Sequence, residues 1–242
     1  MNEILSVDQL AISFGSNEVL KSINFKLHEN EVLGVIGPNG AGKTVMLNIL
    51  TGILKPSKGT VTFLGEDITK MPVAARCREG VGRTFQVPRP FEKMTVFENI
   101  LVGCVYGGRL SEKHAKNNAM DILEKTKLAD RRNDFAGKLG LLDRKRLEVG
   151  RALATNPKVL LLDEVGGGLT ESEVEDVLDL VRMVKSQGVS VVWIEHIIKT
   201  MLEGTDKVLL LANGRDIVCG SPINVMNSPE VKEIYIGCDN DQ

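Results

Sequence analysis

Short apolar runs recur along the chain and are separated by longer segments with helical patterning. The runs are residues 32–36, 159–162, 189–194 and 208–211, with a shorter one at 61–64. Apolar runs of this length are typical of strands that are buried on both faces of a parallel sheet. Their alternation with helical segments predicts a doubly wound α/β fold.

The segments between these runs contain helix signals. Residues 44–50 are predicted to form a helix that ends at Thr51. Thr170 and Glu173 form the pattern of a capping box. The apolar positions that follow it recur with the helical period as far as Gly188, which predicts an amphipathic helix.

Two segments depart from this alternation. Residues 1–30 alternate apolar and polar positions, which predicts antiparallel strands at one edge of the molecule. Residues 87–138 contain no buried-strand run, which favours a mainly helical insertion. We therefore expect one domain over residues 1–242, with a core of residues 1–86 and 139–242 and a helical subdomain at 87–138.

Composition and charge exclude several functions. Of the 242 residues, 43% are apolar and only 4% aromatic, so the core is expected to be packed from Val, Leu and Ile. A net charge of −2 offers no basic surface for sequence-independent nucleic-acid binding. No apolar run approaches the ~18 residues that span a bilayer, and the acidic N-terminus does not fit a secretory signal. We therefore expect any link to a membrane to go through another protein.

The cysteines are far apart in the sequence and form no Cys-x-x-Cys pair: Cys77, Cys104, Cys219 and Cys238. This spacing predicts reduced thiols rather than a disulfide or a metal site.

The strongest local motif is Gly37-Pro-Asn-Gly-Ala-Gly-Lys43-Thr44, which fits G-x-x-x-x-G-K-[ST] between a predicted strand and a predicted helix. Glycines let backbone N–H groups turn inward around phosphates, and the helix N-terminus adds positive partial charge. We expect Lys43 to reach the β- and γ-phosphates and Thr44 to hold Mg²⁺. The motif predicts a P-loop nucleoside triphosphatase.

Two carboxylates follow the apolar run at residues 159–162. The carboxyl ends of parallel strands face the ligand crevice of a doubly wound sheet. Asp163 is therefore placed to bind Mg²⁺, and Glu164 to orient or deprotonate an attacking water. Asp163 and Gly166 also fit the D-x-x-G motif of GTPases, but the chain has no Asn-Lys-x-Asp segment to read guanine. We therefore reject the GTPase branch of the P-loop proteins.

With these motifs placed, the chain resembles the ATP-binding subunits of ABC transporters over nearly its full length. The resemblance implies that Phe14 stacks on adenine and that His196 contacts the γ-phosphate. It also implies that Gln86 contacts Mg²⁺ and senses a transmembrane partner, and that residues 139–143 form the signature loop. Catalysis is then assigned to Glu164 and His196, metal binding to Thr44, Gln86 and Asp163, and nucleotide binding to Phe14, Gly37, Pro38, Asn39, Gly40, Ala41, Gly42, Lys43, Thr44, Val45, Gln86 and Asp163.

Shorter segments resemble one group within that family, the importers of branched-chain and other hydrophobic amino acids, which also includes urea and amide importers. These segments are GRTFQ (82–86), MTVFENI (94–100), RALATNPKVLLLDE (151–164) and PEVKEIYIG (229–237). The resemblance implies a second ATP-binding subunit, two membrane permeases and, indirectly, a solute-binding protein, at the cytoplasmic face of the membrane. Two alternatives stay open: the ATPase of a lipid or lipopolysaccharide exporter, and a soluble regulatory ABC ATPase.

The chain departs from the family pattern mainly where it would face a partner subunit. The signature loop, usually Leu-Ser-Gly-Gly-Gln, reads Leu139-Gly140-Leu141-Leu142-Asp143. It lacks the serine hydroxyl, and Asp143 either faces the phosphates or caps the helix that follows. Val45, Val165 and Thr170 replace a hydroxyl residue, a proline and an aspartate. Because the groups for this chain's own ATP are retained, we predict an asymmetric pair with a different ATP-binding subunit.

Overall fold

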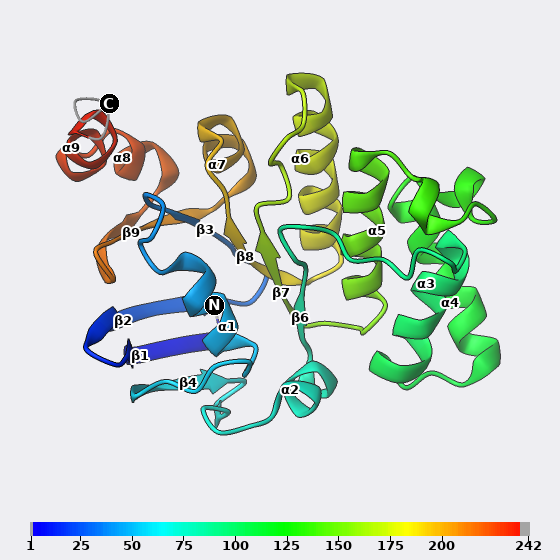
Figure 1. Ribbon diagram of the computed structural model, residues 1–242, viewed down its shortest axis with the longest axis horizontal. Coiled ribbons are helices and arrows are strands. Elements are labelled where there is room, and N and C mark those ends of the chain that lie inside the picture. Colours follow the sequence, from blue (N-terminus) through cyan, green and yellow to red (C-terminus); the bar gives the residue numbers. More distant parts are fainter. Residues whose placement is uncertain (1, 238–242) are drawn as a thin grey trace. The chain divides into compact units, whose positions relative to one another are not determined.

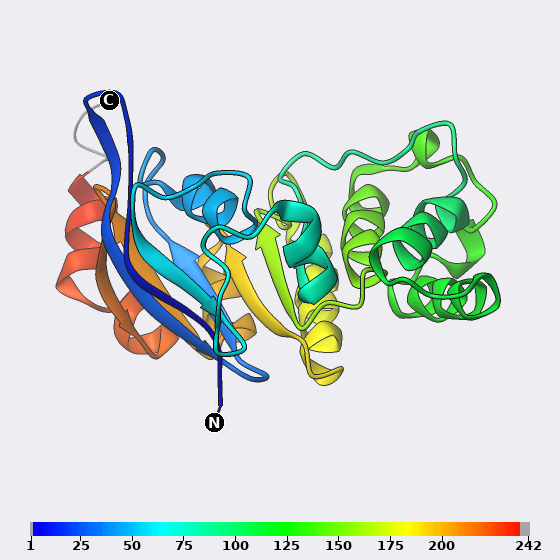
Figure 2. The same ribbon diagram turned by 90° about the horizontal axis from the view of Figure 1, so that it is seen from below.

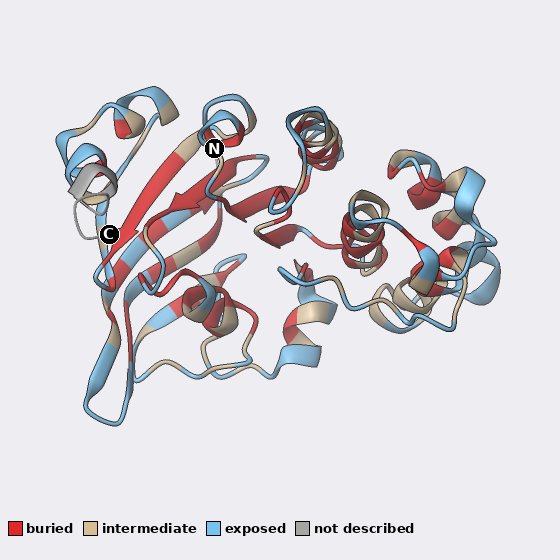
Figure 3. Ribbon diagram, turned by 45° about the horizontal axis from the view of Figure 1, so that its top comes forward, coloured by how far each residue is buried: buried red, intermediate tan, exposed pale blue. Residues whose placement is uncertain are grey.

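The computed structural model describes residues 2–237, which form two compact units (Figures 1 and 2). The first unit contains the chain up to Val73 and again from Ser190, and the second is Ala74–Val189. In both units the short apolar strands are buried, whereas much of the surface of the helices and connecting loops is exposed (Figure 3).

One sheet of the first unit is antiparallel, with strand order β2-β1-β4-β5. Val7 lies opposite Phe25 on one neighbouring strand and Val61 on the other, so apolar side chains share one face. The alternating pattern of residues 1–30 therefore predicted the first two of these strands, β1 and β2, correctly. Their bounds are β1 (Glu3–Phe14), β2 (Asn17–His28), β4 (Lys58–Phe63) and β5 (Glu66–Asp67).

Four more strands of this unit lie in the order β10-β9-β3-β8. β3 (Val32–Ile36) runs parallel to β8 (Ser190–Ile194) and to β9 (Lys207–Ala212), and β10 (Arg215–Gly220) returns antiparallel to β9. All residues of β3 and β8 are buried, as their apolar runs predict. The helices of this unit are α1 (Lys43–Leu50), α7 (Ile198–Gly204), α8 (Pro222–Met226) and α9 (Pro229–Gly237).

The second unit combines a pair of parallel strands, β6 (Val81–Arg83) and β7 (Val159–Asp163), with a set of helices. Residues 87–138 are helical apart from their connections, as the sequence predicted, and α3 and α4 lie beside α5 (Figure 1). The helices are α2 (Val73–Glu79), α3 (Val96–Val102), α4 (Glu112–Lys125), α5 (Leu141–Leu153) and α6 (Glu171–Ser186), with short turns η1 (Gly103–Gly107), η2 (Ala129–Arg131) and η3 (Ala136–Lys138).

The predicted capping box at the start of α6 is present: the Thr170 side chain accepts from the Glu173 N–H, and the Glu173 carboxylate accepts from the Thr170 N–H. The strand predicted at 61–64 begins earlier, and Leu64 lies in the turn that follows it. The three-residue strand β6 was not predicted because so short a segment has no readable periodicity.

In the part of the chain that the structure describes, Cys77, Cys104 and Cys219 are free thiols. Cys238 lies outside those residues. No helix within residues 2–237 has the length and apolarity required to cross a bilayer.

Candidate functional site

The predicted phosphate loop, residues 37–44, connects β3 to α1 in the first unit. Gly37, Gly40 and Gly42 have φ angles of 151°, 80° and 101°, which glycine adopts without the strain that a side chain would cause. A Cβ atom on Gly37 would also lie 1.9 Å from the backbone oxygen of Leu211. The loop can therefore take this shape only with glycine at these positions.

Lys43 is the first residue of α1, and its amine points back into the loop. The amine donates to the backbone oxygens of Gly37, at 2.6 Å, and Pro38, at 3.0 Å. Lys43 is buried, whereas the Thr44 side chain beside it is exposed. A positive charge held inside a loop that precedes a helix N-terminus is suited to binding phosphate oxygens.

Two further predicted residues lie in the first unit. Phe14 ends β1, and half of its accessible surface is exposed. His196 follows β8 with an exposed side chain, and its backbone N–H donates to the carboxylate of Glu195 at 3.2 Å. Their exposure leaves both rings accessible to a ligand, and their assigned roles stay predictions.

The carboxylates of the second unit stand at the end of β7, where the sequence placed them. Asp163 is only 3% exposed, and its Oδ2 atom lies 3.0 Å from Nη2 of Arg83 on the neighbouring β6. Its backbone N–H donates to the hydroxyl of Thr84 at 3.2 Å. The guanidinium keeps the buried carboxylate charge-balanced, because an unpaired charge in this position would be costly.

Glu164 is held from two sides. Its carboxylate accepts a hydrogen bond from the side-chain amide of Gln86, 78 residues earlier in the chain. Its backbone oxygen accepts from the buried amine of Lys145 at 3.0 Å, and its φ angle of 50° lies in the left-handed region. The structure thus brings together Gln86 and Glu164, which sequence analysis had singled out separately, and adds Lys145, which it had missed.

The signature segment, residues 139–143, is partly helical. Gly140 is the N-cap of α5, which begins at Leu141. The capping role considered for Asp143 is wrong, because this residue lies inside the first turn of α5 and no side chain caps the helix. Instead, the Asp143 carboxylate pairs with Arg146, at 3.1 Å, and with Arg131, at 3.2 Å.

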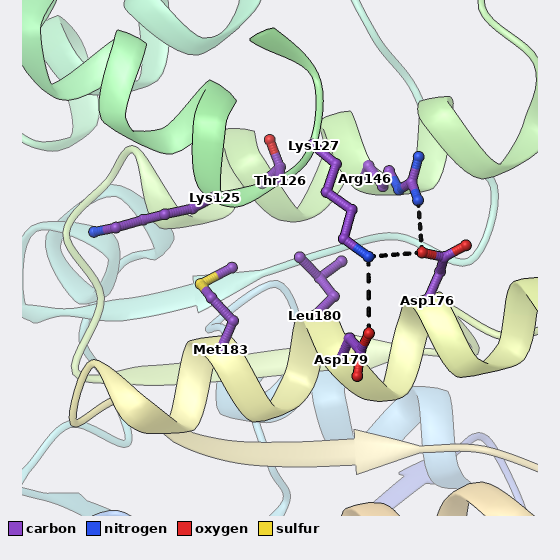
Figure 4. A pocket seen from close by; sticks show the side chains of 8 residues that line it. All are labelled: Lys125, Thr126, Lys127, Arg146, Asp176, Asp179, Leu180 and Met183. Atoms are coloured by element: carbon purple, nitrogen blue, oxygen red, sulfur yellow. Dashed lines mark hydrogen bonds and ion pairs between the residues drawn. The ribbon is translucent and has the colours of Figure 1, made fainter.

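The charge of Asp143 is therefore balanced by arginines, and the ion pairs continue onto α6. Arg146 also lies 2.9 Å from Asp176, whose same oxygen is 2.9 Å from the amine of Lys127. Figure 4 shows Arg146 and Lys127 pointing toward Asp176 at the edge of a small surface pocket. Lys127 also approaches Asp179 at 3.7 Å.

The residues predicted to hold a metal ion supply only oxygen ligands: the hydroxyl of Thr44, the side-chain carbonyl of Gln86 and the carboxylate of Asp163. Hard oxygen donors with a single carboxylate are typical of Mg²⁺ bound together with nucleotide phosphates. The carboxylate of Asp163 supplies such a donor, and its contact with Arg83 is made through Oδ2.

Comparison with known proteins gives consistent matches. A family profile described as ABC transporter matches residues 20–166. The branched-chain amino acid transport ATP-binding proteins BraF of Pseudomonas aeruginosa and LivG of Escherichia coli are 34% and 33% identical over 97% of this chain and 98% of their own lengths. The lipopolysaccharide export system ATP-binding protein LptB of Haemophilus influenzae is 30% identical over 97% of each chain. The crystal structure of an ATP-binding cassette of an ABC transporter, in its ADP conformation, has a TM-score of 0.89 at 34% identity and covers 98% of this chain and 100% of that chain.

Proposed function

Because this chain belongs to the ATP-binding proteins of ABC transporters, and is therefore an ATPase coupled to transport, we propose that it powers the uptake of branched-chain amino acids or of a similar small organic solute. The observation that carries this proposal is the full-length similarity to BraF and LivG, which spans both compact units. Lipopolysaccharide export is the second candidate, since LptB matches over the same share of the chain at slightly lower identity.

In the proposed function, the first unit binds the nucleotide. The backbone N–H groups of residues 39–42 and the amine of Lys43 bind the phosphates, which the inward-pointing amine supports. Phe14 stacks on the adenine ring, and His196 contacts the γ-phosphate. Both assignments are supported by the exposure of these rings.

The second unit supplies the groups for hydrolysis. Asp163 and Gln86, with Thr44 from the phosphate loop, would hold Mg²⁺, which when bound neutralises charge on the phosphate oxygens. Glu164 orients the attacking water and accepts its proton. The hydrogen bond from Gln86 to the carboxylate of Glu164 supports this role, because it limits the orientations that the carboxylate can take.

We further propose that the chain works at the cytoplasmic face of a membrane, with a second, different ATP-binding subunit, two permeases and, indirectly, a solute-binding protein. Three apolar side chains exposed around Gln86 support a permease contact: Phe85, Val87 and Phe91. Exposed apolar residues gathered on one segment are typical of a protein interface.

Purification of the chain with its native partners, followed by reconstitution into lipid vesicles, tests this proposal. We expect permeases to co-purify and leucine to accumulate in an ATP-dependent way that Lys43→Ala abolishes. Extraction of lipopolysaccharide without leucine uptake would instead establish the export function. Purification without any membrane protein would contradict both and leave a soluble regulatory ATPase.

A further inference from the structure

One face of α5, the helix labelled in Figure 1, carries three charged residues at intervals of three: Lys145, Glu148 and Arg151. Positions three residues apart on a helix are neighbours on its surface. Lys145 and Glu148 are buried, and Arg151 is partly buried. Each of the three contacts a loop that bears a residue of the proposed hydrolytic site, and we call them the α5 stripe.

The middle member of the stripe holds the loop that contains Gln86. The carboxylate of Glu148 is buried, lies 3.2 Å from Nη1 of Arg151 and lines the same small pocket as Phe85 and Gln86. Burial has the larger effect and raises the pKa of Glu148, whereas the backbone amides of Phe85 and Arg89, on either side of Gln86, favour its charged form and so lower the pKa. One buried carboxylate therefore faces both ends of this short segment.

Arg151 reinforces this attachment. Its Nη1 atom donates to the backbone oxygen of Arg89 at 2.7 Å and lies 3.2 Å from the carboxylate of Glu148. Its guanidinium stacks on the ring of Phe91, 4.8 Å from the ring centre. Arg151 therefore holds the segment from Phe85 to Phe91 at two residues, Arg89 and Phe91.

Lys145 connects the same helix to the other loop. Its amine donates to the backbone oxygen of Glu164, whose backbone is in the left-handed region. The contact between the Gln86 amide and the Glu164 carboxylate is thus made between two loops that are both attached to α5. A shift of either loop along this helix would break that contact.

We propose that Glu148 is a positioning residue for ATP hydrolysis, which fixes the Gln86 loop so that the Gln86 amide holds the Glu164 carboxylate in its working orientation. This inference rests on the roles proposed above for Gln86 and Glu164. The Glu148 carboxylate pairs with the Arg151 guanidinium that holds the loop, whereas a carboxamide is neutral and brings an N–H group of its own toward that guanidinium. Since α5 begins with the signature residues, the stripe also links that segment to both loops.

The test compares Glu148→Gln with the parent chain, each purified with its native partner subunits. Amide hydrogen exchange is expected to be faster at Phe85 and Arg89, while the amides of α4 keep their protection. A misplacement of about 1 Å in an active site can cost about 10²-fold, so we expect kcat to fall by about 10-fold to 10²-fold. The KM for ATP is expected to stay within about twofold, because the stripe does not hold the phosphate loop. Glu124→Gln, the same change at an exposed position of α4, is the matched control and should leave both readouts unchanged.

Parent-like kcat in Glu148→Gln would overturn the proposal, and so would unchanged exchange at Phe85 and Arg89. Should Glu148→Gln fail to fold, Glu148→Asp keeps both oxygens and the charge but shortens their reach. Native circular dichroism with reduced kcat would then support the proposal, and parent-like kcat would refute it. Neither readout depends on which solute is carried. Parent-like hydrolysis by Glu164→Gln would separately refute the role of Glu164 in hydrolysis, on which this inference rests.

Discussion

Among single residues of the proposed site, Glu164 has a backbone in the left-handed region, with a φ angle of 50°. A side chain larger than that of glycine costs roughly 1–2 kcal/mol in the left-handed region. Such strain persists only where surrounding contacts hold it, and it gathers at functional sites. Here the contacts are the amine of Lys145 on the backbone oxygen and the amide of Gln86 on the carboxylate.

Glu164→Gln is expected to leave ATP binding intact and to lower turnover by ~10²-fold or more, because the amide keeps the shape of the side chain but cannot accept a proton from water. Nucleotide affinity and steady-state hydrolysis of the complex measure the two effects. Glu171→Gln, an exposed position at the start of α6, is the control. Turnover within about twofold of the parent would refute the assignment.

The titration of Glu148 gives a second prediction at this scale. Burial raises the pKa of Glu148 above its ordinary value of 4.5, although Arg151 acts in the opposite direction. The folded chain then binds this proton more tightly than the unfolded chain does. The stability of the parent relative to Glu148→Gln should therefore be greatest below pH 4.5 and fall as the pH rises through the folded pKa.

Urea unfolding of both chains from about pH 2 to pH 7 measures this difference. The contribution of Asp176 to stability should change with pH in the opposite direction, because the hydrogen bond from Lys127 lowers the pKa of Asp176 below the ordinary 3.8. The stability of the parent relative to Asp176→Asn should be present above pH 3.8 and be lost as the pH falls through the folded pKa. Equal slopes for the two substitutions would contradict both assignments.

At the scale of elements, ion pairs join α5 and α6. Arg146 is the shared member, since it contacts Asp143 on its own helix and Asp176 on α6. Its side chain is only 14% exposed, so its pairs are screened less than those at the surface. These contacts attach the first turn of α5, which carries the last signature residues, to the helix that follows the Glu164 loop.

Arg146→Met should lower the free energy of unfolding by about 1 kcal/mol or more, because it leaves two partly buried carboxylates without this partner. Arg182→Met removes an arginine from a pair with Asp179 in which both side chains are about half exposed, and we expect it to cost only a few tenths of a kcal/mol. Urea unfolding at low and high salt measures both. Equal losses of unfolding free energy for the two variants would show that the pairs joining the helices stabilise the fold no more than an exposed pair does.

At the scale of the whole molecule, the altered signature segment predicts an asymmetric assembly. The carboxylate of Asp143 is paired with two arginines, so repulsion from phosphate contributes less to this argument than the sequence indicated. We still expect the missing serine hydroxyl and the bulk of Leu142 to weaken the contact of this segment with a partner's nucleotide. If the partner has an intact signature segment, we expect no loss in the hydrolysis of the ATP that Lys43 and Glu164 of this chain serve.

We therefore expect slow hydrolysis by the isolated chain and faster hydrolysis with its partner subunit. Lys43→Ala should reduce transport more than the equivalent lysine substitution in the partner. Paired measurements of hydrolysis and transport in the reconstituted complex decide this. Equal losses from the two substitutions, or a larger loss from the partner's lysine, would contradict the asymmetric arrangement.

The sequence by itself determined those features that depend on neighbouring residues. The apolar run of β3, the glycines and lysine of residues 37–44 and the capping box of α6 are local patterns, because strand burial, phosphate-loop geometry and helix capping each involve residues within a few positions. Together they were sufficient for the fold class, the nucleotide and the family. The order of the motifs then separated Asp163 and Glu164 from ordinary turn residues.

Only the tertiary structure decided which charged and polar side chains meet. Arg83 and Asp163 are 80 residues apart, and the segment that contains Arg83 gives no sign of which strand lies beside it. The Gln86 contact with Glu164 and the attachment of both loops to α5 depend in the same way on how β6, β7 and α5 pack. Each charged residue has many possible partners of opposite sign in the sequence. Packing selects among them, because a buried charge needs a partner at the position where the folded chain places it.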